Sequence, residues 1–269
     1  MVIEGVKHIV AVASGKGGVG KSTVTVNLAL AMAAEGYRVG ILDADIHGPS
    51  QAQMLGVAEG SRPQQEGANK FRPIEAHGIQ AMSMAFMVDT REPMVWRGPM
   101  IAGAFQQLLN QTAWQNLDVL FIDMPPGTGD IQLTLAQQVP VNGAVIVTTP
   151  QDIALLDARK GIEMFRKVHV PVLGVVENMS LHVCSNCGHS EPVFGEGGGE
   201  RIAAEYETNV LGRLPLTMSI REQVDGGRPT VVAEPESEVT ATFRSMARQV
   251  AEALKAKPDE AGPSISFSE

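Results

Sequence analysis

The sequence has 269 residues, of which 44% are hydrophobic, enough to form a substantial core without the help of a membrane. Its formal net charge is −9 and only 4% of its residues are aromatic, so it is poorly suited to bind nucleic acid through phosphate neutralisation or base stacking. No apolar run approaches the roughly 20 residues that span a bilayer, and glycines interrupt the N-terminal stretch where a signal peptide is unbroken. We therefore expect a cytoplasmic protein that binds neither nucleic acid nor membrane.

Strand-like apolar runs alternate with helical patterns, which predicts an α/β, doubly wound, mostly parallel sheet with helices on both faces. The expected strands are 6–13, 38–42, 79–87, 117–123, 143–149, 170–177 and 210–214. The expected helices are 21–35, 100–111, 152–168, 200–206 and 239–254. An exposed excursion is predicted over 57–75 and a loop without regular structure over 178–199. We expect a single domain over 1–256, followed by a disordered tail over 257–269.

A glycine-rich segment after the first predicted strand matches the pattern G-x-x-x-x-G-K-[ST] and directly precedes a predicted helix. Glycines allow successive backbone N–H groups to point at phosphate oxygens, and the N-terminus of the helix adds its dipole. Lys21 is expected to reach the β- and γ-phosphates of ATP, and Ser22 to hold Mg²⁺. The expected nucleotide contacts are Gly15, Gly17, Gly18, Val19, Gly20, Lys21, Ser22 and Thr23. A glycine-rich turn that binds nothing is the alternative.

Aspartates follow two of the predicted strands. Asp43 ends one strand, with Asp45 on the loop beyond it, and Asp123 ends an apolar run typical of a Walker B segment. Because open α/β sheets bind ligands at the carboxyl ends of their strands, we expect these side chains to surround the nucleotide. We assign Asp45 to the attacking water, and Asp43 and Asp123 to the magnesium side. Which of Asp43 and Asp45 orients the water is open, since aspartates after strands also cap helices and turns.

The form GKGGVGKST resembles the deviant Walker A loop of the SIMIBI-class ATPases. This resemblance implies that Lys16 reaches across a dimer interface to the partner's nucleotide, and hence that the protein is a nucleotide-dependent homodimer. A solvated loop lysine is the alternative.

Further segments narrow the resemblance to the Mrp/ApbC family over about residues 5–255. They are DADIHGPS (43–50), AMSMAFMVD (81–89), WRGPM (96–100), DMPPGTGD (123–130) and ENMS (177–180) with a following C-x-x-C. The family likeness implies that Asn178 contacts adenine and that backbone near Pro215 closes the pocket. Many bacterial members carry a small extra domain ahead of the ATPase domain, whereas this sequence begins almost at the strand before the loop. We therefore expect any contribution of that domain to target choice to be absent or supplied by another protein.

Cys184 and Cys187 form a single C-x-x-C, which is half of a four-thiolate metal site. Two chains that meet at a two-fold axis would bring four thiolates together. Such a set suits either Zn²⁺ or an iron–sulfur cluster. A Cys₂His₂ zinc site with His182 and His189 and a redox disulfide are further alternatives. The Mrp/ApbC resemblance favours a labile, bridging [4Fe–4S] cluster.

Together these features predict a slow ATPase that takes an iron–sulfur cluster from a donor and transfers it to apoproteins. The alternatives are a Min- or partition-type positioning ATPase and a zinc-bridged dimeric ATPase. The acidic balance and the proline-broken C-terminal stretch disfavour a positioning ATPase, because DNA or membrane forms need basic faces or tails. An electron donor of the nitrogenase-iron-protein type is disfavoured, because those proteins take their cysteines from separate segments of each chain.

Overall fold

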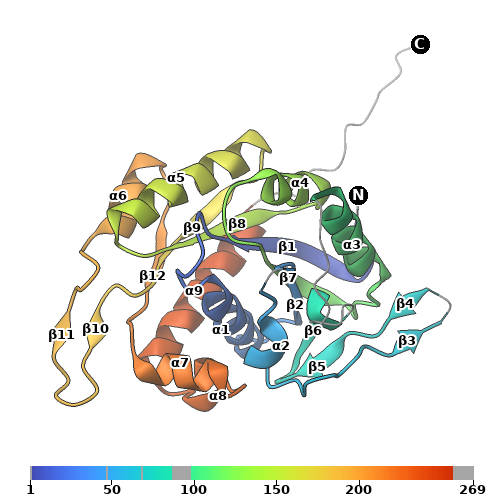
Figure 1. The fold of residues 1–269 in the computed structure, drawn as a ribbon, viewed down its shortest axis with the longest axis horizontal. Coiled ribbons are helices and arrows are strands. Elements are labelled where there is room, and N and C mark those ends of the chain that lie inside the picture. The colour runs from blue at the N-terminus through green and yellow to red at the C-terminus, as the bar shows by residue number, and fades with distance from the viewer. Residues whose placement is uncertain (1, 47, 68, 87–97, 257–269) are drawn as a thin grey trace, which may run out of the picture.

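The computed structural model describes residues 2–46, 48–67, 69–86 and 98–256. Its central strands are β1 (Val6–Ala13), β2 (Val39–Asp43), β5 (Ile74–Ala76), β6 (Ile79–Ser83), β7 (Leu117–Asp123), β8 (Gly143–Thr148), β9 (Val172–Glu177) and β12 (Val210–Arg213). They form one eight-stranded sheet in the order β12-β9-β8-β1-β7-β2-β6-β5 (Figure 1). All neighbouring pairs are parallel except β5 and β6 at one edge.

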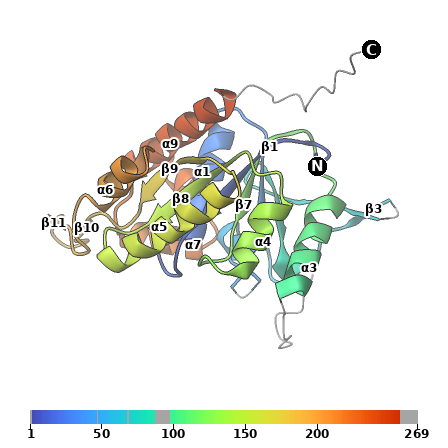
Figure 2. The same ribbon diagram turned by 90° about the horizontal axis from the view of Figure 1, so that it is seen from above.

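Helices lie on both faces of the sheet, as Figure 2 shows from above. One face packs against α1 (Lys21–Ala34), α7 (Met218–Asp225), α8 (Thr230–Ala233) and α9 (Glu238–Lys255), with the short α2 (Gln51–Met54) beside α1. The other face packs against α3 (Gly98–Gln111), α4 (Asp130–Gln138), α5 (Asp152–Lys167) and α6 (Gly198–Glu205). The predicted doubly wound α/β class is confirmed.

The sequence of β1 shows how one strand serves both cores. Val10 and Val12 belong to the cluster under α1 and α9, whereas Ile9, Ala11 and Ala13 belong to the cluster under α3 to α6. Successive side chains of a strand point to opposite faces, so the part of a strand that is covered on both sides is apolar, as the buried residues 9–13 of β1 are. This burial fixes β1 in the middle of the sheet and places the loop that follows it at the carboxyl edge.

Three predicted segments differ from the structure. The strand predicted over 79–87 ends at Ser83 and continues as a 3₁₀ turn over Met84–Phe86, and residue 87 lies outside the described residues. The excursion over 57–75 holds a hairpin, β3 (Gln65–Glu66) with β4 (Lys70–Phe71), and then enters β5. The loop over 178–199 is not irregular throughout, because β10 (His182–Val183) and β11 (Ser190–Glu191) form a second hairpin. Strands of two residues are too short to leave an alternating pattern in the sequence.

Sequence reasoning also missed four helices, the short α2 and α8 and the longer α4 and α7. The helix α4 begins directly after a Pro-Pro-Gly-Thr-Gly stretch that indicates a loop, and α7 buries only Val224 of its eight residues. A helix with so small an apolar face gives a weak periodic signal. No helix in the described part of the chain is long and apolar enough to cross a bilayer. The predicted tail over 257–269 lies outside the described residues.

Candidate active site and thiolate pair

The glycine-rich loop joins β1 to α1 at the carboxyl edge of the sheet. Gly18 and Gly20 both have φ of 81°, in the left-handed region where side chains are strained. At Gly20 there is no room either, because a Cβ would lie 2.2 Å from the amide nitrogen of Asn178. The helix α1 begins at Lys21 without a side-chain cap on its first turn, so backbone N–H groups there are available to an anion. This geometry is that of a phosphate cradle.

Asp43 and Asp123 end the neighbouring strands β2 and β7, and the sheet register pairs them directly. Both are fully buried. Lys21, 6% exposed, places its Nζ 2.5 Å from Oδ1 of Asp123, and Thr25 of α1 donates to the same oxygen at 3.0 Å. A buried carboxylate needs such partners, because its desolvation is otherwise costly. The structure brings together these three charged residues, which the sequence analysis assigned to one site, and adds Thr25, which the sequence did not indicate.

The Asp43 carboxylate holds the loop that follows β2. It accepts hydrogen bonds from the backbone N–H groups of Asp45 (3.1 Å), Ser50 (2.9 Å) and Gln51 (3.0 Å), and from the Ser83 hydroxyl at 3.3 Å. Burial raises the pKa of Asp43 to about 7, and the negative charge of the adjacent Asp123 adds to this shift. Asp45 lies half-buried on the loop, where its Oδ1 accepts from the Gly48 N–H at 3.3 Å.

Gln51 is a site residue that the sequence did not reveal. It is 1% exposed, and its Nε2 donates to Oδ2 of Asp123 at 2.8 Å and to the Ser22 carbonyl at 3.0 Å. It thereby joins the strand-end carboxylate to the phosphate loop. A glutamine after a Gly-Pro-Ser stretch resembles an ordinary loop residue, so only the packing reveals this role.

The loop after β7 lies against the phosphate loop. The Gly127 N–H donates to the Ser14 carbonyl at 2.9 Å, and Gln132 of α4 donates to the Pro126 carbonyl at 2.5 Å. Lys16 is half-buried, and its carbonyl accepts from the Ser14 hydroxyl at 2.8 Å. The loop after β7 is therefore bonded to the loop that would hold the phosphates.

Asn178 directly follows β9 and supports the phosphate loop from behind. Its Nδ2 donates to the Val19 carbonyl at 2.8 Å, and its side chain is buried against Gly20. Pro215 is half-buried on the neighbouring segment after β12. The backbone of that segment bonds to the chain after Asn178, because the Ser180 N–H donates to the Leu214 carbonyl at 2.9 Å.

The two cysteines lie at the tip of the β10–β11 hairpin. The Cys184 N–H donates to the His189 carbonyl and the Gly188 N–H to the Cys184 carbonyl, both at 2.9 Å. Backbone N–H groups of Cys187 and Asn186 lower the pKa of the Cys184 thiol, which favours the thiolate that binds metals. In the described ranges, no group of three or more His, Cys, Asp and Glu side chains could hold a metal ion. One chain therefore offers, in its described part, two cysteine sulfur ligands and no completed site.

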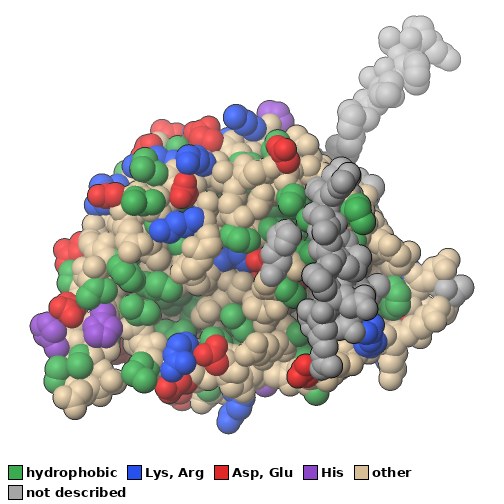
Figure 3. Space-filling view, in the orientation of Figure 1, with side chains coloured by type: hydrophobic (Ala, Val, Ile, Leu, Met, Phe, Trp, Pro, Cys, Tyr) green, Lys and Arg blue, Asp and Glu red, His purple; other side chains and the backbone are tan. Residues whose placement is uncertain are grey.

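Exposed hydrophobic side chains lie near the β10–β11 hairpin and on α5, beside the phosphate loop. Leu181, Val193 and Met218 are between 41% and 56% exposed around the hairpin, and Met218 contacts Ser185. Figure 3 shows hydrophobic and histidine side chains over this hairpin, at the left of the molecule. Ile153 and Leu156 are 70% and 55% exposed on α5, whose backbone packs against Gly15 of the phosphate loop.

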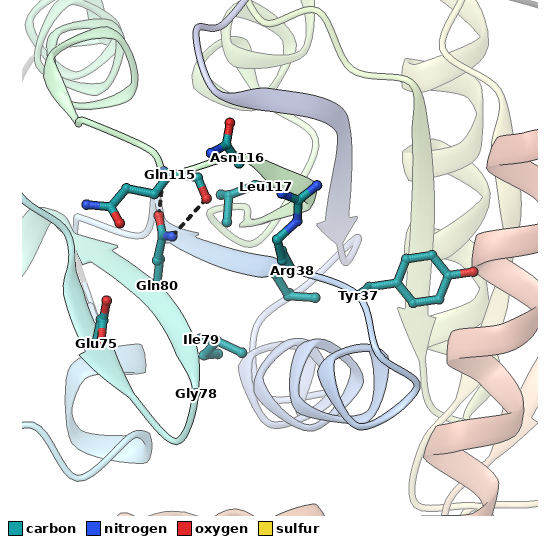
Figure 4. A pocket seen from close by; sticks show the side chains of 10 residues that line it. Tyr37, Arg38, Glu75, Gly78, Ile79, Gln80, Gln115, Asn116 and Leu117 are labelled. Carbon is teal, nitrogen blue, oxygen red and sulfur yellow. Dashed lines mark hydrogen bonds between the residues drawn. The ribbon is translucent and has the colours of Figure 1, made fainter.

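A surface pocket lies at the other end of the strands, where β2, β6 and β7 begin (Figure 4). Gln80 and Gln115 on its wall bond to each other, with the Gln115 N–H 2.9 Å from Oε1 of Gln80. Arg38 is engaged by the Asp118 carboxylate. The pocket is therefore remote from the strand ends at Asp43 and Asp123 and belongs to a different part of the molecule.

Comparison with known proteins places this geometry in a family. A family model described as "ParA: NUBPL iron-transfer P-loop NTPase" matches residues 5–251. The chain belongs to the NUBPL iron-transfer P-loop NTPase family. A relative from Pseudomonas fragi called "Iron-sulfur cluster carrier protein" is 67% identical over 242 residues, which are 90% of this chain and 84% of that protein.

Solved structures agree with the NUBPL-family assignment. A nucleotide-binding protein from Archaeoglobus fulgidus, in complex with ADP, has a TM-score of 0.76 and 38% identity over 89% of this chain and 93% of that one. The Pyrococcus furiosus cell division ATPase MinD has a TM-score of 0.67 and 23% identity over 91% and 98% of the two chains, a likeness of fold. The predicted Mrp/ApbC resemblance, the SIMIBI-type fold and the class of P-loop ATPase are confirmed. This class implies a nucleotide with Mg²⁺ at the phosphate loop.

Proposed function

We propose that this NUBPL-family ATPase carries a [4Fe–4S] cluster between two copies of the chain and transfers it to apoproteins. The observation that carries the proposal is the half-site at the hairpin tip. Cys184 and Cys187 lie on one turn, whose backbone N–H groups lower the pKa of the Cys184 thiol, and no described side chains complete a metal site around the pair. A second copy would supply the missing two thiolates. The name of the Pseudomonas fragi relative supports an iron–sulfur cargo over zinc.

Exposed apolar side chains near the hairpin and on α5 support a homodimer through this side of the molecule. In such a dimer Lys16 would reach the partner's nucleotide, so that nucleotide state would alter the distance between the two cysteine pairs. Asp45 would orient the attacking water, with Asp43 and Asp123 on the magnesium side. Asn178 and backbone near Pro215 would contact the adenine base. To do so, the Asn178 amide would give up its hydrogen bond to the Val19 carbonyl and form one to the base.

A cluster carrier of this kind needs a reducing location and partner proteins. We infer a cytoplasmic location, where thiols remain reduced and a labile cluster can be exchanged. Cluster donors and apoproteins would be its partners.

Anaerobic reconstitution with iron and sulfide tests the cluster. We expect about four iron atoms per two chains and a visible charge-transfer absorption, both lost in the Cys184→Ala, Cys187→Ala variant. A His182→Ala, His189→Ala variant is the matched control. It should retain the iron, since the proposed ligands are cysteines alone, whereas a Cys₂His₂ site would lose its metal in this variant. Equal iron uptake by wild type and the cysteine variant contradicts the proposal. Stoichiometric zinc in anaerobically purified protein would favour the zinc-bridged dimer instead.

The dimer is tested separately by sedimentation of the reconstituted protein with and without ATP. Lys16→Ala should weaken ATP-dependent association while the iron content of the associated fraction stays unchanged. Co-sedimentation with anionic vesicles or with DNA in the presence of ATP would instead support a positioning ATPase.

A further inference from the structure

Gln51 has a buried oxygen atom without a partner in the middle of the active site. Its Nε2 uses both hydrogens, on Asp123 and on the Ser22 carbonyl, and its backbone N–H donates to Asp43. Its Oε1 is buried and has no hydrogen-bond partner among the described residues. A buried acceptor left unpaired costs roughly 1–3 kcal/mol. This cost would be removed if a bound ligand brought a hydrogen-bond donor to the Oε1 atom of Gln51.

The orientation of the amide is determined by its neighbours. Crystallographers often cannot tell the nitrogen of a glutamine amide from its oxygen, and the assignment then depends on the hydrogen-bond partners. Here both partners of Nε2, the Asp123 carboxylate and the Ser22 carbonyl, can only accept. The reversed amide would place an oxygen against two oxygens. The unpartnered atom of Gln51 is therefore its carbonyl oxygen.

The surroundings indicate the kind of donor. Gln51 touches Ser22, which would bind Mg²⁺ directly, and Asp123, which would hold the ion through water. Magnesium gives up its water reluctantly and usually keeps several molecules when it binds protein and phosphate. A metal-bound water is a strong donor, and a glutamine carbonyl oxygen is an acceptor. The unpaired oxygen therefore fits a hydrated Mg²⁺ that arrives with the nucleotide.

We propose that Oε1 of Gln51 accepts a hydrogen bond from a water molecule of the nucleotide-bound Mg²⁺. Gln51 is then a positioning residue, which couples the metal to the Asp123 carboxylate and to the phosphate loop. This inference rests on the magnesium–nucleotide site and not on cluster transfer. A purely structural role is the competing explanation, in which Gln51 only supports the phosphate loop through Nε2.

Metal and nucleotide binding separate the two roles. ADP affinity is measured in EDTA, and Mg²⁺ is then titrated into the ADP complex by calorimetry, for wild type and for Gln51→Met. We expect Gln51→Met to weaken Mg²⁺ binding about tenfold, as loss of an outer-shell partner does, with metal-free ADP affinity within about twofold of wild type. Gln51→Glu is expected to stay protonated beside the buried Asp123 carboxylate, so that its hydroxyl still donates to Asp123, its carbonyl oxygen remains an acceptor, and Mg²⁺ binding is retained. Gln53→Met, on the exposed side of the same short helix, is the matched control and should change neither.

Two results would overturn the inference. The first is Mg²⁺ affinity in Gln51→Met within twofold of wild type. The second is a parallel loss of metal-free ADP affinity in both Gln51 variants, which means that Gln51 only supports the loop. If Gln51→Met does not fold, Gln51→Glu decides, because weaker Mg²⁺ binding with an acceptor still present contradicts the proposed contact. Iron uptake at the cysteines is independent of all these outcomes, so a failure here is distinguishable from a failure of cluster carriage.

Discussion

Two parts of the molecule differ in how completely one chain builds them. At the carboxyl edge of the sheet, Lys21, Asp43 and Asp123 are almost fully buried, and side chains from α1 and α2 bond to them. At the β10–β11 hairpin, Cys184 is half-buried and Cys187 is exposed, and the described contacts of the turn include backbone hydrogen bonds and a contact of the Ser185 hydroxyl with Met218. The first site depends on the core, and the second on a short hairpin at the periphery.

The difference has a physical origin. Buried charges need several fixed partners, so a site made from them becomes part of what holds the fold together. Exposed thiols on a turn cost the fold little and can be added or removed without repacking. We therefore expect changes at the phosphate loop to affect activity and stability together, and changes at the hairpin to affect metal binding alone.

The largest effect is expected for Lys21→Met. It removes the lysine that would contact the phosphates and leaves the buried Asp123 without its ion-pair partner. We expect ATP turnover to fall by roughly 100-fold or more and the free energy of unfolding to fall by about 3–5 kcal/mol. Urea denaturation and phosphate release measure the two quantities. Lys7→Met is the matched control, because Lys7 pairs with Asp118 at the surface, where such pairs contribute about 1 kcal/mol or less. If Lys21→Met and Lys7→Met lowered the free energy of unfolding equally, the expected difference between the buried ion pair and the surface ion pair would be wrong.

A pH dependence should follow from Asp43. Its pKa is raised to about 7 in the folded chain, so the folded state keeps a proton that the unfolded chain has already lost above its ordinary pKa. Stability from this group is therefore full at low pH and is lost as the pH rises through about 7. In EDTA without nucleotide, we expect a decline of up to roughly 1.4 kcal/mol per pH unit between pH 5 and 7. Asp43→Asn should flatten this slope. If the free energy of unfolding of Asp43→Asn still fell with pH at the wild-type rate, the pH dependence would come from other groups.

A smaller effect is expected for Asn178→Ala, which leaves the buried Val19 carbonyl without its donor. The free energy of unfolding should fall by about 1–3 kcal/mol. If Asn178 also contacts adenine, the variant should lose more affinity for ADP than for GDP, measured by calorimetry. An equal loss for both nucleotides would restrict Asn178 to supporting the loop.

The smallest effect on the fold is expected for the Cys184→Ala, Cys187→Ala variant. Because neither side chain belongs to the core, the metal-free protein should unfold within about 0.5 kcal/mol of wild type. Thermal and urea denaturation of the metal-free forms measure this. A large loss in the free energy of unfolding would show that the cysteine side chains stabilise the metal-free fold, contrary to this expectation.

Sequence patterns predicted much of the active site, because its residues follow strands. Apolar runs that end in Asp43 and Asp123 become neighbouring parallel strands, so their last residues meet at one edge. Thr25 and Gln51 escaped notice because their roles depend on where a helix packs, which no local pattern records. The resemblance assigned Asn178 to adenine, whereas its amide bonds to Val19 in this structure, and the adenine contact stays a prediction. The hairpin around the cysteines was missed because each of its strands has two residues.

The two-thiolate turn has a consequence for how loading would respond to protein concentration. A centre shared by two chains forms at a rate and to an extent that depend on the square of the chain concentration, whereas a site within one chain fills in simple proportion. Such a carrier would be loaded where it is abundant and would release its cargo on dilution. A receiving protein that offers its own cysteines needs only to displace one subunit from the pair, which makes dissociation of the dimer itself a step in delivery.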